Sequence, residues 1–462
     1  MNLRPPSRPA PRAWPAAFPR QAHPPSAPLA PPLRFITGFE GTQMFGHDTD
    51  VLDTTEHATR YPDDLALLVR DGIGSLRACI PWHKVERERG RYDWGWTDAY
   101  LTEVRRLGLN PIVDPLHHTS FPHWLEHGFA NPDFPDAYER FVLAFAERYP
   151  WVTDYTIINE PLATAVLCGF TGDWHPHWQG REGVVPVVLG MARAIARITP
   201  GLERRVPGLR VVHVDTCERH HALDAPSRVH AEFANELRFV VLDLILGRVD
   251  RGHPLWATLR GHGMSAEDAA WFRANPARVD VLGLDYYAHS EMGWTTQGRS
   301  ERFRPLGFRR AALEYADRYG LPMMLSETNL RGRIEDRISW LRYMVGESEA
   351  LAAELAARGS SFGEFCWYPF IDSTDWDSLV REPRRSIDPQ GVYWLSAHFD
   401  RQGSELSQLY AALARGEVGA ADLPAYRFEE AVLDGRGVRK FLPHMASWSW
   451  REGEPSGWRR TG

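Results

Sequence analysis

Thr156-Ile157-Ile158-Asn159-Glu160-Pro161 has the pattern of a buried strand that ends in a carboxamide and a carboxylate. Pro161 cannot donate to a sheet ladder, so the strand is expected to stop there. A second stretch, Leu321-Pro322-Met323-Met324-Leu325-Ser326-Glu327-Thr328-Asn329, has the same form. In α/β barrels, chemistry takes place at the carboxyl ends of the strands. Glu160 and Glu327 are therefore predicted to form one paired-carboxylate site, the alternative being two surface glutamates after ordinary strands.

Strand-like and helix-like segments alternate along the rest of the chain. Strands are expected at residues 33–40, 75–80, 110–114, 152–158, 209–215, 279–285, 323–326 and 362–367. Helices are expected at residues 61–71, 97–107, 136–148, 184–198, 231–246, 309–319 and 333–357. About eight strand–helix units favour an α/β fold of the (β/α)8 TIM-barrel type in one domain. A doubly wound open sheet more often has a Gly-rich phosphate turn after its first strand, and none is present.

The two ends of the chain differ in composition from this barrel, which is expected over residues 33–415. Residues 1–32 are rich in Pro, Ala and Arg, without the continuous apolar core of a signal peptide, and are expected to be a disordered tail. Residues 416–462 are irregular and rich in Trp, Pro and Arg. They are interpreted as a C-terminal extension that packs on the barrel or is partly loose.

Composition narrows the possible partners. The 462 residues carry a formal net charge of only -7, which does not indicate a basic surface that binds nucleic acid or an anionic membrane. No apolar run is expected to cross a membrane. The 18 tryptophans often stand beside polar residues, an arrangement that suits stacking and hydrogen bonding to sugar rings, although many are expected to fill the core.

The four cysteines are Cys79, Cys168, Cys217 and Cys366, and none belongs to a CxxC pair. They are expected to be small buried residues rather than metal ligands or disulfide partners. This usage favours a reducing compartment, and a cytoplasmic location is expected. The oligomeric state is left open.

The motifs on several expected strands together resemble those of the family-one glycoside hydrolases, the β-glucosidase type of (β/α)8 retaining glycosidase. Asn159-Glu160-Pro161 is similar to the family's fourth-strand motif, and Ser326-Glu327-Thr328-Asn329 stands where the family usually has Thr-Glu-Asn-Gly. The segment 280–287 resembles the sixth strand, with Asp285 in place of the usual Asn. Residues 367–376 resemble the eighth strand, with Asp375-Trp376 in place of Glu-Trp.

This resemblance implies a two-glutamate mechanism and its supporting groups. Glu160 would be the general acid, and Glu327 the nucleophile, kept ionised by Arg77 and Tyr287. Independently of the resemblance, Arg77 is expected to have a carboxylate partner, because burying an arginine inside an apolar strand is energetically costly unless it is paired. A structural acid elsewhere is the alternative partner for Arg77.

The resemblance also implies a set of sugar-binding side chains. Gln43 and His117 would bind hydroxyls, Asn159 would hold the 2-hydroxyl, and Trp367 and Trp376 would form the floor and wall that stack on the ring. Asp375 would contact hydroxyls on the far side of the ring. Glu40 and His118 depart from the family pattern near the pocket, as do Asp285 and Asp375. These departures indicate an uncommon sugar preference.

The expected ligand is a small-molecule glycoside or oligosaccharide, with no cofactor. A metal site is not expected, because adjacent histidines such as His117-His118 point to opposite faces of a strand. Two alternatives to a hydrolase stay open. One is a barrel that binds carbohydrate without cleaving it, and the other is a transglycosidase on the same scaffold.

Overall fold

The computed structural model describes residues 32–45, 49–295, 300–302, 307–425, 448–450 and 458–460, the last two segments and 300–302 by their backbone only. The tail expected over residues 1–32 lies outside these described residues except at its last position. Most of the extension expected over 416–462 also lies outside them. The start of that extension, at residues 420–423, packs on the barrel: Arg342 donates to the carbonyl of Ala421 over 3.1 Å, and Leu423 is buried.

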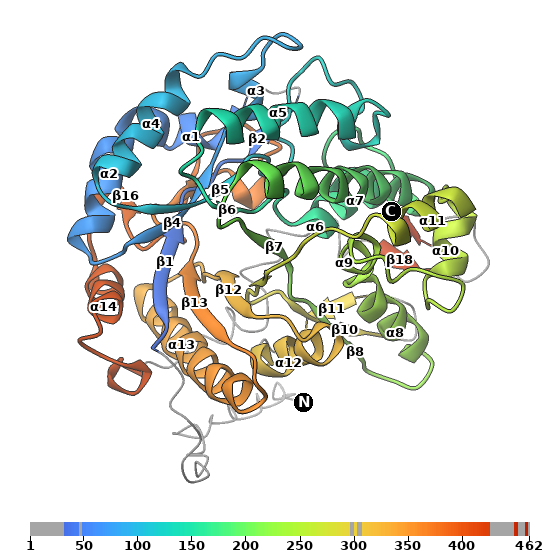
Figure 1. Cartoon of the computed structure of the whole chain (residues 1–462). Helices are drawn as coiled ribbons and strands as arrows, with labels where there is room; N and C mark the ends of the chain where they lie inside the picture. The colour runs from blue at the N-terminus through green and yellow to red at the C-terminus, as the bar shows by residue number, and fades with distance from the viewer. Residues whose placement is uncertain are drawn as a thin grey trace, which may run out of the picture.

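Eight parallel strands close into a barrel at the centre of the molecule (Figure 1), as the sequence predicts. Their order around the barrel is β1-β13-β12-β9-β7-β6-β5-β4. The strands are β1 (Arg34–Gly38), β4 (Ser75–Cys79), β5 (Asn110–Asp114), β6 (Asp154–Tyr155), β7 (Arg210–Thr216), β9 (Val281–Asp285), β12 (Met323–Glu327) and β13 (Phe362–Trp367).

The outer layer consists mainly of helices that follow the strands (Figure 1). They are α2 (His57–Arg70), α4 (Gly95–Arg106), α5 (Phe134–Arg148), α7 (Gly180–Arg205), α12 (Phe308–Tyr319), α13 (Ile334–Ala357) and α14 (Glu405–Ala414). The helix expected at 231–246 is two helices, α8 (Arg228–Leu237) and α9 (Val240–Ile245). The break lies at Arg238, whose guanidinium donates to the Glu218 carbonyl over 2.7 Å and pairs with Glu314.

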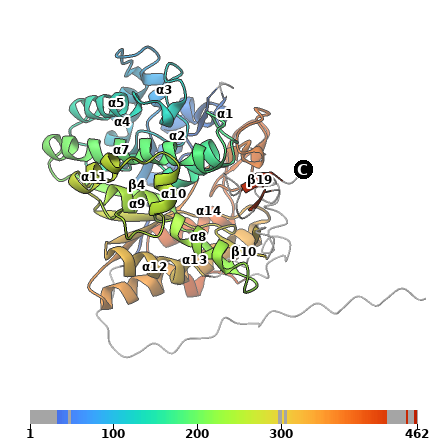
Figure 2. The ribbon, with the colours of Figure 1, turned by 90° about the vertical axis from the view of Figure 1, so that its right-hand side faces the viewer.

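Loop elements that sequence periodicity does not predict cover one side of the barrel. Figure 2 shows this side, where α8 and α9 lie together with α10 (Trp256–Gly261) and α11 (Ala266–Ala274). A small sheet in the order β11-β10-β8 joins β8 (Arg219–Ala222), β10 (Glu291–Trp294) and β11 (Ser300–Arg302). The short elements α6 (Pro161–Ala165) and a π-helical turn, η2 (Val166–Phe170), follow β6.

The remaining short elements are loop strands and single helical turns. They are β2 (Gln43–Met44), β3 (Thr49–Asp50), α1 (Val51–Thr54), α3 (Trp82–Val85), η1 (Gly128–Ala130), β14 (Ser373–Thr374), η3 (Trp376–Ser378), β15 (Ile387–Asp388), β16 (Trp394–Leu395), β17 (Arg401–Gln402), η4 (Ala420–Asp422), β18 (Trp448–Trp450) and β19 (Trp458–Arg460).

The barrel interior is a packed core, which leaves only the ends of the strands open to ligands. Alternate strand residues such as Ile36, Ile112, Val214 and Met324 fill it, and all are buried. All four cysteines are buried and carry free thiols, as expected.

The helix α7 differs from the expectation that no apolar stretch is long enough to cross a membrane. Among the described residues it alone meets that test of length and composition. However, 72% of its apolar window is buried inside the protein, as in the core helix of a folded domain. Two arginines in the middle of the helix are also paired, with Arg193 bound to Asp268 and Arg197 within 2.8 Å of Glu139.

Candidate functional site

One cavity of about 470 Å³ opens at the carboxyl ends of the barrel strands. Sugar and cofactor sites are concave pockets of this order of size. Six side chains singled out from the sequence line it: Glu40, His118, Glu160, Tyr287, Glu327 and Trp376. Both predicted carboxylates therefore face one cavity, as their positions at the ends of β6 and β12 imply.

Glu160 is placed by an irregular continuation of β6. The strand was expected to reach residue 158 but ends at Tyr155. Beyond it, the amide of Glu160 still donates to the carbonyl of Val214 over 3.1 Å. Glu160 itself has φ 41° and ψ 60°, a left-handed conformation that costs about 1–3 kcal/mol in a non-glycine residue. Pro161 then begins α6, a position that suits its fixed φ.

Glu327 is held by two donors, one on each carboxylate oxygen. Arg77 donates to Oε1, and the hydroxyl of Tyr287 donates to Oε2 over 2.6 Å. Arg77 is 1% exposed, and it also donates to Oδ1 of Asn159 over 2.5 Å. The buried arginine thus has the carboxylate partner that its place in β4 demands. Such charge-assisted hydrogen bonds favour the ionised carboxylate that a nucleophile requires.

Glu160 and Glu327 lie close together and share the site with a third carboxyl group, Asp285. One oxygen from each of these residues lies within 4.8 Å of the others. Burial, followed by the charge of Glu327, raises the pKa of Glu160 well above its usual range. Glu160 is therefore the better proton donor of the two, and Glu327 is the carboxylate that two donors hold in place.

Asp285 is also placed to remain protonated. Its Oδ1 accepts a hydrogen bond of 2.5 Å from Ser326, and its buried Oδ2 has no partner among the described residues. Burial and then the charge of Glu327 raise the pKa of Asp285 well above its usual range, outweighing the effect of Arg77. A raised carboxyl pKa makes folding less favourable as the pH rises above about 4, where the unfolded side chain ionises.

Asp285→Asn is therefore expected to make the protein increasingly more stable than the parent as the pH rises from about 4, because the amide does not ionise. Below that pH the two proteins should have equal free energies of unfolding. Urea denaturation from pH 4 to pH 9 measures the difference, with the exposed Asp63→Asn as a control that follows the parent. A variant that is less stable than the parent at pH 8 would show that the native protein holds Asp285 as an anion.

His117 does not reach the cavity, because Glu40 lies between them. The imidazole is 1% exposed, with Nδ1 at 2.6 Å from Asp114 and Nε2 at 3.2 Å from Glu40. Burial would lower the pKa of His117, but nearby Cys79, Glu40 and Asp114 raise it well above its usual range. Burial would likewise raise the pKa of Glu40, but His117 lowers it to about 2. The cavity therefore presents the anionic Glu40 in place of His117.

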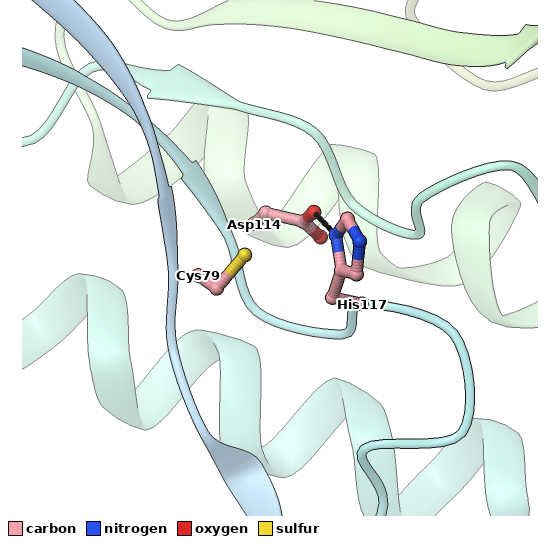
Figure 3. Close-up of side chains that lie close together, drawn as sticks. All are labelled: Cys79, Asp114 and His117. Carbon is pink, nitrogen blue, oxygen red and sulfur yellow. Dashed lines mark hydrogen bonds and ion pairs between the residues drawn. The ribbon is translucent and has the colours of Figure 1, made fainter. Parts of the chain in front are cut away.

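Among the described residues, two clusters have the composition of metal sites. Figure 3 shows the first, in which ligand atoms of Cys79, Asp114 and His117 lie within 4.8 Å of one another. Burial raises the pKa of the Cys79 thiol, which donates to the carbonyl of Phe39 over 3.3 Å, whereas a metal needs the thiolate. The second consists of Glu160, Asp285 and Glu327, where Arg77 and Tyr287 already occupy both oxygens of Glu327.

His118 and Trp376 form part of the wall beside the acid. His118 lies 3.7 Å from Glu160 and bonds Thr164 over 2.8 Å. Burial and the charge of His117 lower the pKa of His118 well below its usual range, so this imidazole is neutral. Its ring packs edge-on against Trp376, with centroids 5.9 Å apart. The indole Nε1–H of Trp376 is buried and has no partner among the described residues.

Four other predicted sugar-binding residues are buried behind the cavity wall. Asn159 holds Arg77, as described above. Gln43 donates to the carbonyl of Met44 over 3.0 Å. Trp367 does not form a stacking floor, because its indole is fully buried and donates to the carbonyl of Gln390 over 2.9 Å.

Asp375 likewise does not face the cavity. Its two carboxylate oxygens accept the backbone N–H groups of Arg385 and Ser386, each over 2.8 Å, and the side chain is fully buried. In this structure Asp375 therefore stabilises the loop that carries Trp376 and does not reach a ligand.

Sequence reasoning missed two supporting residues. Asp215, near the end of β7, accepts the backbone N–H of Leu162 over 3.1 Å and so fixes the chain just after the acid. Burial raises the pKa of Asp215 to about 7. Tyr368 packs its ring 5.0 Å from the guanidinium carbon of Arg77. A polar or aromatic residue at the end of a predicted strand was the available signal for both.

Some known proteins are similar in sequence to part of this chain. No protein-family model matches the chain. Beta-glucosidase 47 of Arabidopsis thaliana is 28% identical over 131 residues, which are 26% of this chain and 24% of that protein. The 6-phospho-beta-glucosidase of Dickeya chrysanthemi is 24% identical over 160 residues, 33% of this chain and 34% of that protein. The chain thus matches only about a third or less of the length of these curated relatives.

Solved structures extend the likeness to the whole barrel. The family 1 b-glucosidase from Thermotoga maritima aligns with a TM-score of 0.73 at 15% identity, covering 84% of this chain and 98% of that one. The chain resembles the family-one β-glucosidases. A second structure, the Thermotoga maritima beta-glucosidase in complex with methoxycarbonyl-substituted glucoimidazole, gives a TM-score of 0.72 at 14% identity over 84% of this chain and 99% of that one. The resemblance drawn from the motifs is confirmed, and at these identities the shared feature is the fold.

Proposed function

We propose that the protein is a retaining β-glycosidase that hydrolyses O-glycosidic bonds with Glu160 and Glu327. The observation that carries this proposal is the placement of the two carboxyl groups in one cavity, with oxygens within 4.8 Å of each other. Retaining enzymes hold the two groups about 5–5.5 Å apart, whereas inverting enzymes leave about 6.5–9.5 Å for a water molecule. The short separation favours attack by a carboxylate over attack by water.

In the first half of the proposed reaction, Glu327 attacks the anomeric carbon as Glu160 protonates the leaving oxygen. The carbon–oxygen bond to the leaving group breaks, and its electron pair takes the proton from Glu160. An ester then joins the sugar to Glu327. Arg77 and Tyr287 hold the carboxylate oxygens in place for this step, and the buried setting of Glu160 supplies the proton near neutral pH.

In the second half, Glu160 is ionised and acts as a base. It removes a proton from water, whose oxygen attacks the anomeric carbon and displaces the carboxylate of Glu327. The sugar leaves with its original configuration, and Glu160 again carries a proton. Both residues return to their starting states, so the cycle needs no other reactant.

The proposed sugar site differs from that expected from the family motifs. Glu40 replaces His117 at the wall, and Trp376 lines the same cavity. Anionic Glu40 suits hydroxyl donors and disfavours an anionic sugar, since like charges repel. The relative from Dickeya chrysanthemi is a 6-phospho-beta-glucosidase, so the two substrate types form a direct comparison.

A panel of 4-nitrophenyl β-glycosides tests the proposal. We expect at least one neutral glycoside to be cleaved with a β-anomeric first product by NMR, and the 6-phosphoglucoside to be a poorer substrate than its parent. Cleavage that gives an α-anomer first would contradict the retaining mechanism. Sugar binding without cleavage would favour a carbohydrate-binding barrel, and products that appear only with added alcohols or sugars would favour a transglycosidase.

A further inference from the structure

The cavity has two halves of different chemistry, with the carboxylates between them. One half lies at the ends of β12, β13 and β1, where Asn329, Gln390 and Glu40 line it. The other half extends toward the helices that follow β6 and β7. In the barrel, β12, β13 and β1 are consecutive neighbours, and β6 and β7 form another adjacent pair. The two halves therefore lie on different sides of the barrel mouth.

The second half is an apolar chamber lined by Leu167, Val184, Val188, Leu237, Leu255 and Leu259. These side chains come from η2, α7, α8, α10 and the turn that precedes α10. Figures 1 and 2 show α8, α9 and α10 gathered on this side of the barrel. Arg181, Glu218, His220 and Arg238 also line the cavity. The six aliphatic side chains offer no hydrogen bonds to sugar hydroxyls, which would lose their water on entering. The surface that they form consequently suits an aliphatic group better than a second sugar.

The position of the acid decides which part of a substrate meets this chamber. Glu160 must reach the leaving oxygen, so the leaving group begins beside Glu160. The residues that directly follow the acid, Leu162 and Ala163, line the cavity, and Leu167 continues the wall into the chamber. The half with Glu40 and Gln390 is then left for the sugar.

We propose that the chamber binds the aliphatic leaving group of the substrate, which makes the protein a hydrolase of β-glycosides with long alkyl or lipid-like aglycones. This inference rests on the proposed function, since it assigns the leaving-group side of the same site. Each buried methylene is expected to raise kcat/KM by about fourfold until the chamber is full.

Hydrolysis of ethyl, butyl, hexyl and octyl β-glycosides of the best sugar tests the inference. These alcohols have similar acidity, so differences among them report binding rather than bond cleavage. All are used below the concentration at which octyl glycosides form micelles. We expect kcat/KM to rise by at least roughly 100-fold from ethyl to octyl. A flat series would overturn the inference while leaving the glycosidase function intact.

Variants that fill the chamber give a second, independent readout. Ala234 on α8 and Thr258 on α10 line it, whereas Glu232 and Ala257 on the same helices are exposed. Ala234→Trp and Thr258→Trp should remove the preference for octyl, so that the ratio of kcat/KM for the octyl and ethyl glycosides falls toward one. Glu232→Trp and Ala257→Trp should keep the full series. Unchanged octyl preference in both filled variants would contradict the assignment.

A binding measurement separates failure of this inference from failure of the glycosidase proposal. If no glycoside is cleaved, the proposed function fails, and calorimetry with Glu327→Gln still tests the chamber. Octyl β-glucoside is expected to bind at least roughly 100-fold more tightly than ethyl β-glucoside, and Ala234→Trp should abolish the difference. Equal affinity for the two glucosides would rule out the aliphatic site.

Discussion

Glu327→Ala is expected to lower kcat by roughly 10⁴-fold or more on every glycoside, because no other carboxylate can form the glycosyl ester. Arg77 and Tyr287 both donate to this side chain, so the variant also leaves a buried arginine without its main partner. Steady-state kinetics measure the loss. The exposed Glu126→Ala serves as a control and should match the parent.

Azide makes this result specific for a nucleophile. In Glu327→Ala the anomeric carbon is open from the side that the carboxylate occupied, so added azide should restore part of the activity on an activated glycoside. The product should be the α-glycosyl azide, identified by NMR. A β-glycosyl azide would contradict the role of Glu327 as nucleophile, and a thermal melt shows whether the variant remains folded.

Glu160→Ala is expected to have an effect that depends on the leaving group. Glycosides with poor leaving groups, such as the alkyl series, should lose about 10²–10⁴-fold in kcat/KM, because their alcohol must be protonated. Dinitrophenyl glycosides leave without a proton and should lose far less in that parameter. Equal losses on both classes would show that Glu160 is not the acid.

The pH dependence of activity is a further test of Glu160 as the acid. An acid must be protonated to act, so parent activity falls as the pH rises through the pKa of Glu160. Burial and the charge of Glu327 raise that pKa well above its usual range, which keeps the parent active toward neutral pH. In Glu160→Ala this alkaline limb should disappear from kcat/KM for 4-nitrophenyl glycosides, whose leaving oxygen the acid protonates in the parent. If the limb persists unchanged, another group gives rise to it.

The paired carboxylates could be predicted without coordinates because each follows an apolar strand. Periodicity marks the strands, and parallel strands in a closed barrel bring their carboxyl ends to one mouth. The same logic correctly paired Arg77 with a carboxylate at that mouth, since a buried arginine in β4 has few alternatives. The sequence also places Asn159 beside Glu160, because both residues follow the same strand.

It was harder to predict which side chains would face the sugar site than which would lie at the mouth of the barrel. His117, Trp367 and Asp375 were all expected at the sugar, yet each is occupied by a partner. Trp367 bonds a carbonyl 23 residues away, and Arg77 bonds a glutamate 250 residues away. Such partners are set by loop packing, which local periodicity does not encode.

By itself, the sequence determined the barrel, its strand order along the chain and the two glutamates at its mouth, because these depend on local hydrophobic patterns. Only the tertiary structure decided that Glu40 covers His117, that Asp285 joins the carboxyl pair, and that an apolar chamber opens beside Glu160. The physical reason is that these features come from contacts between loops and helices far apart in the chain, whose energies depend on shape and burial once the barrel has closed.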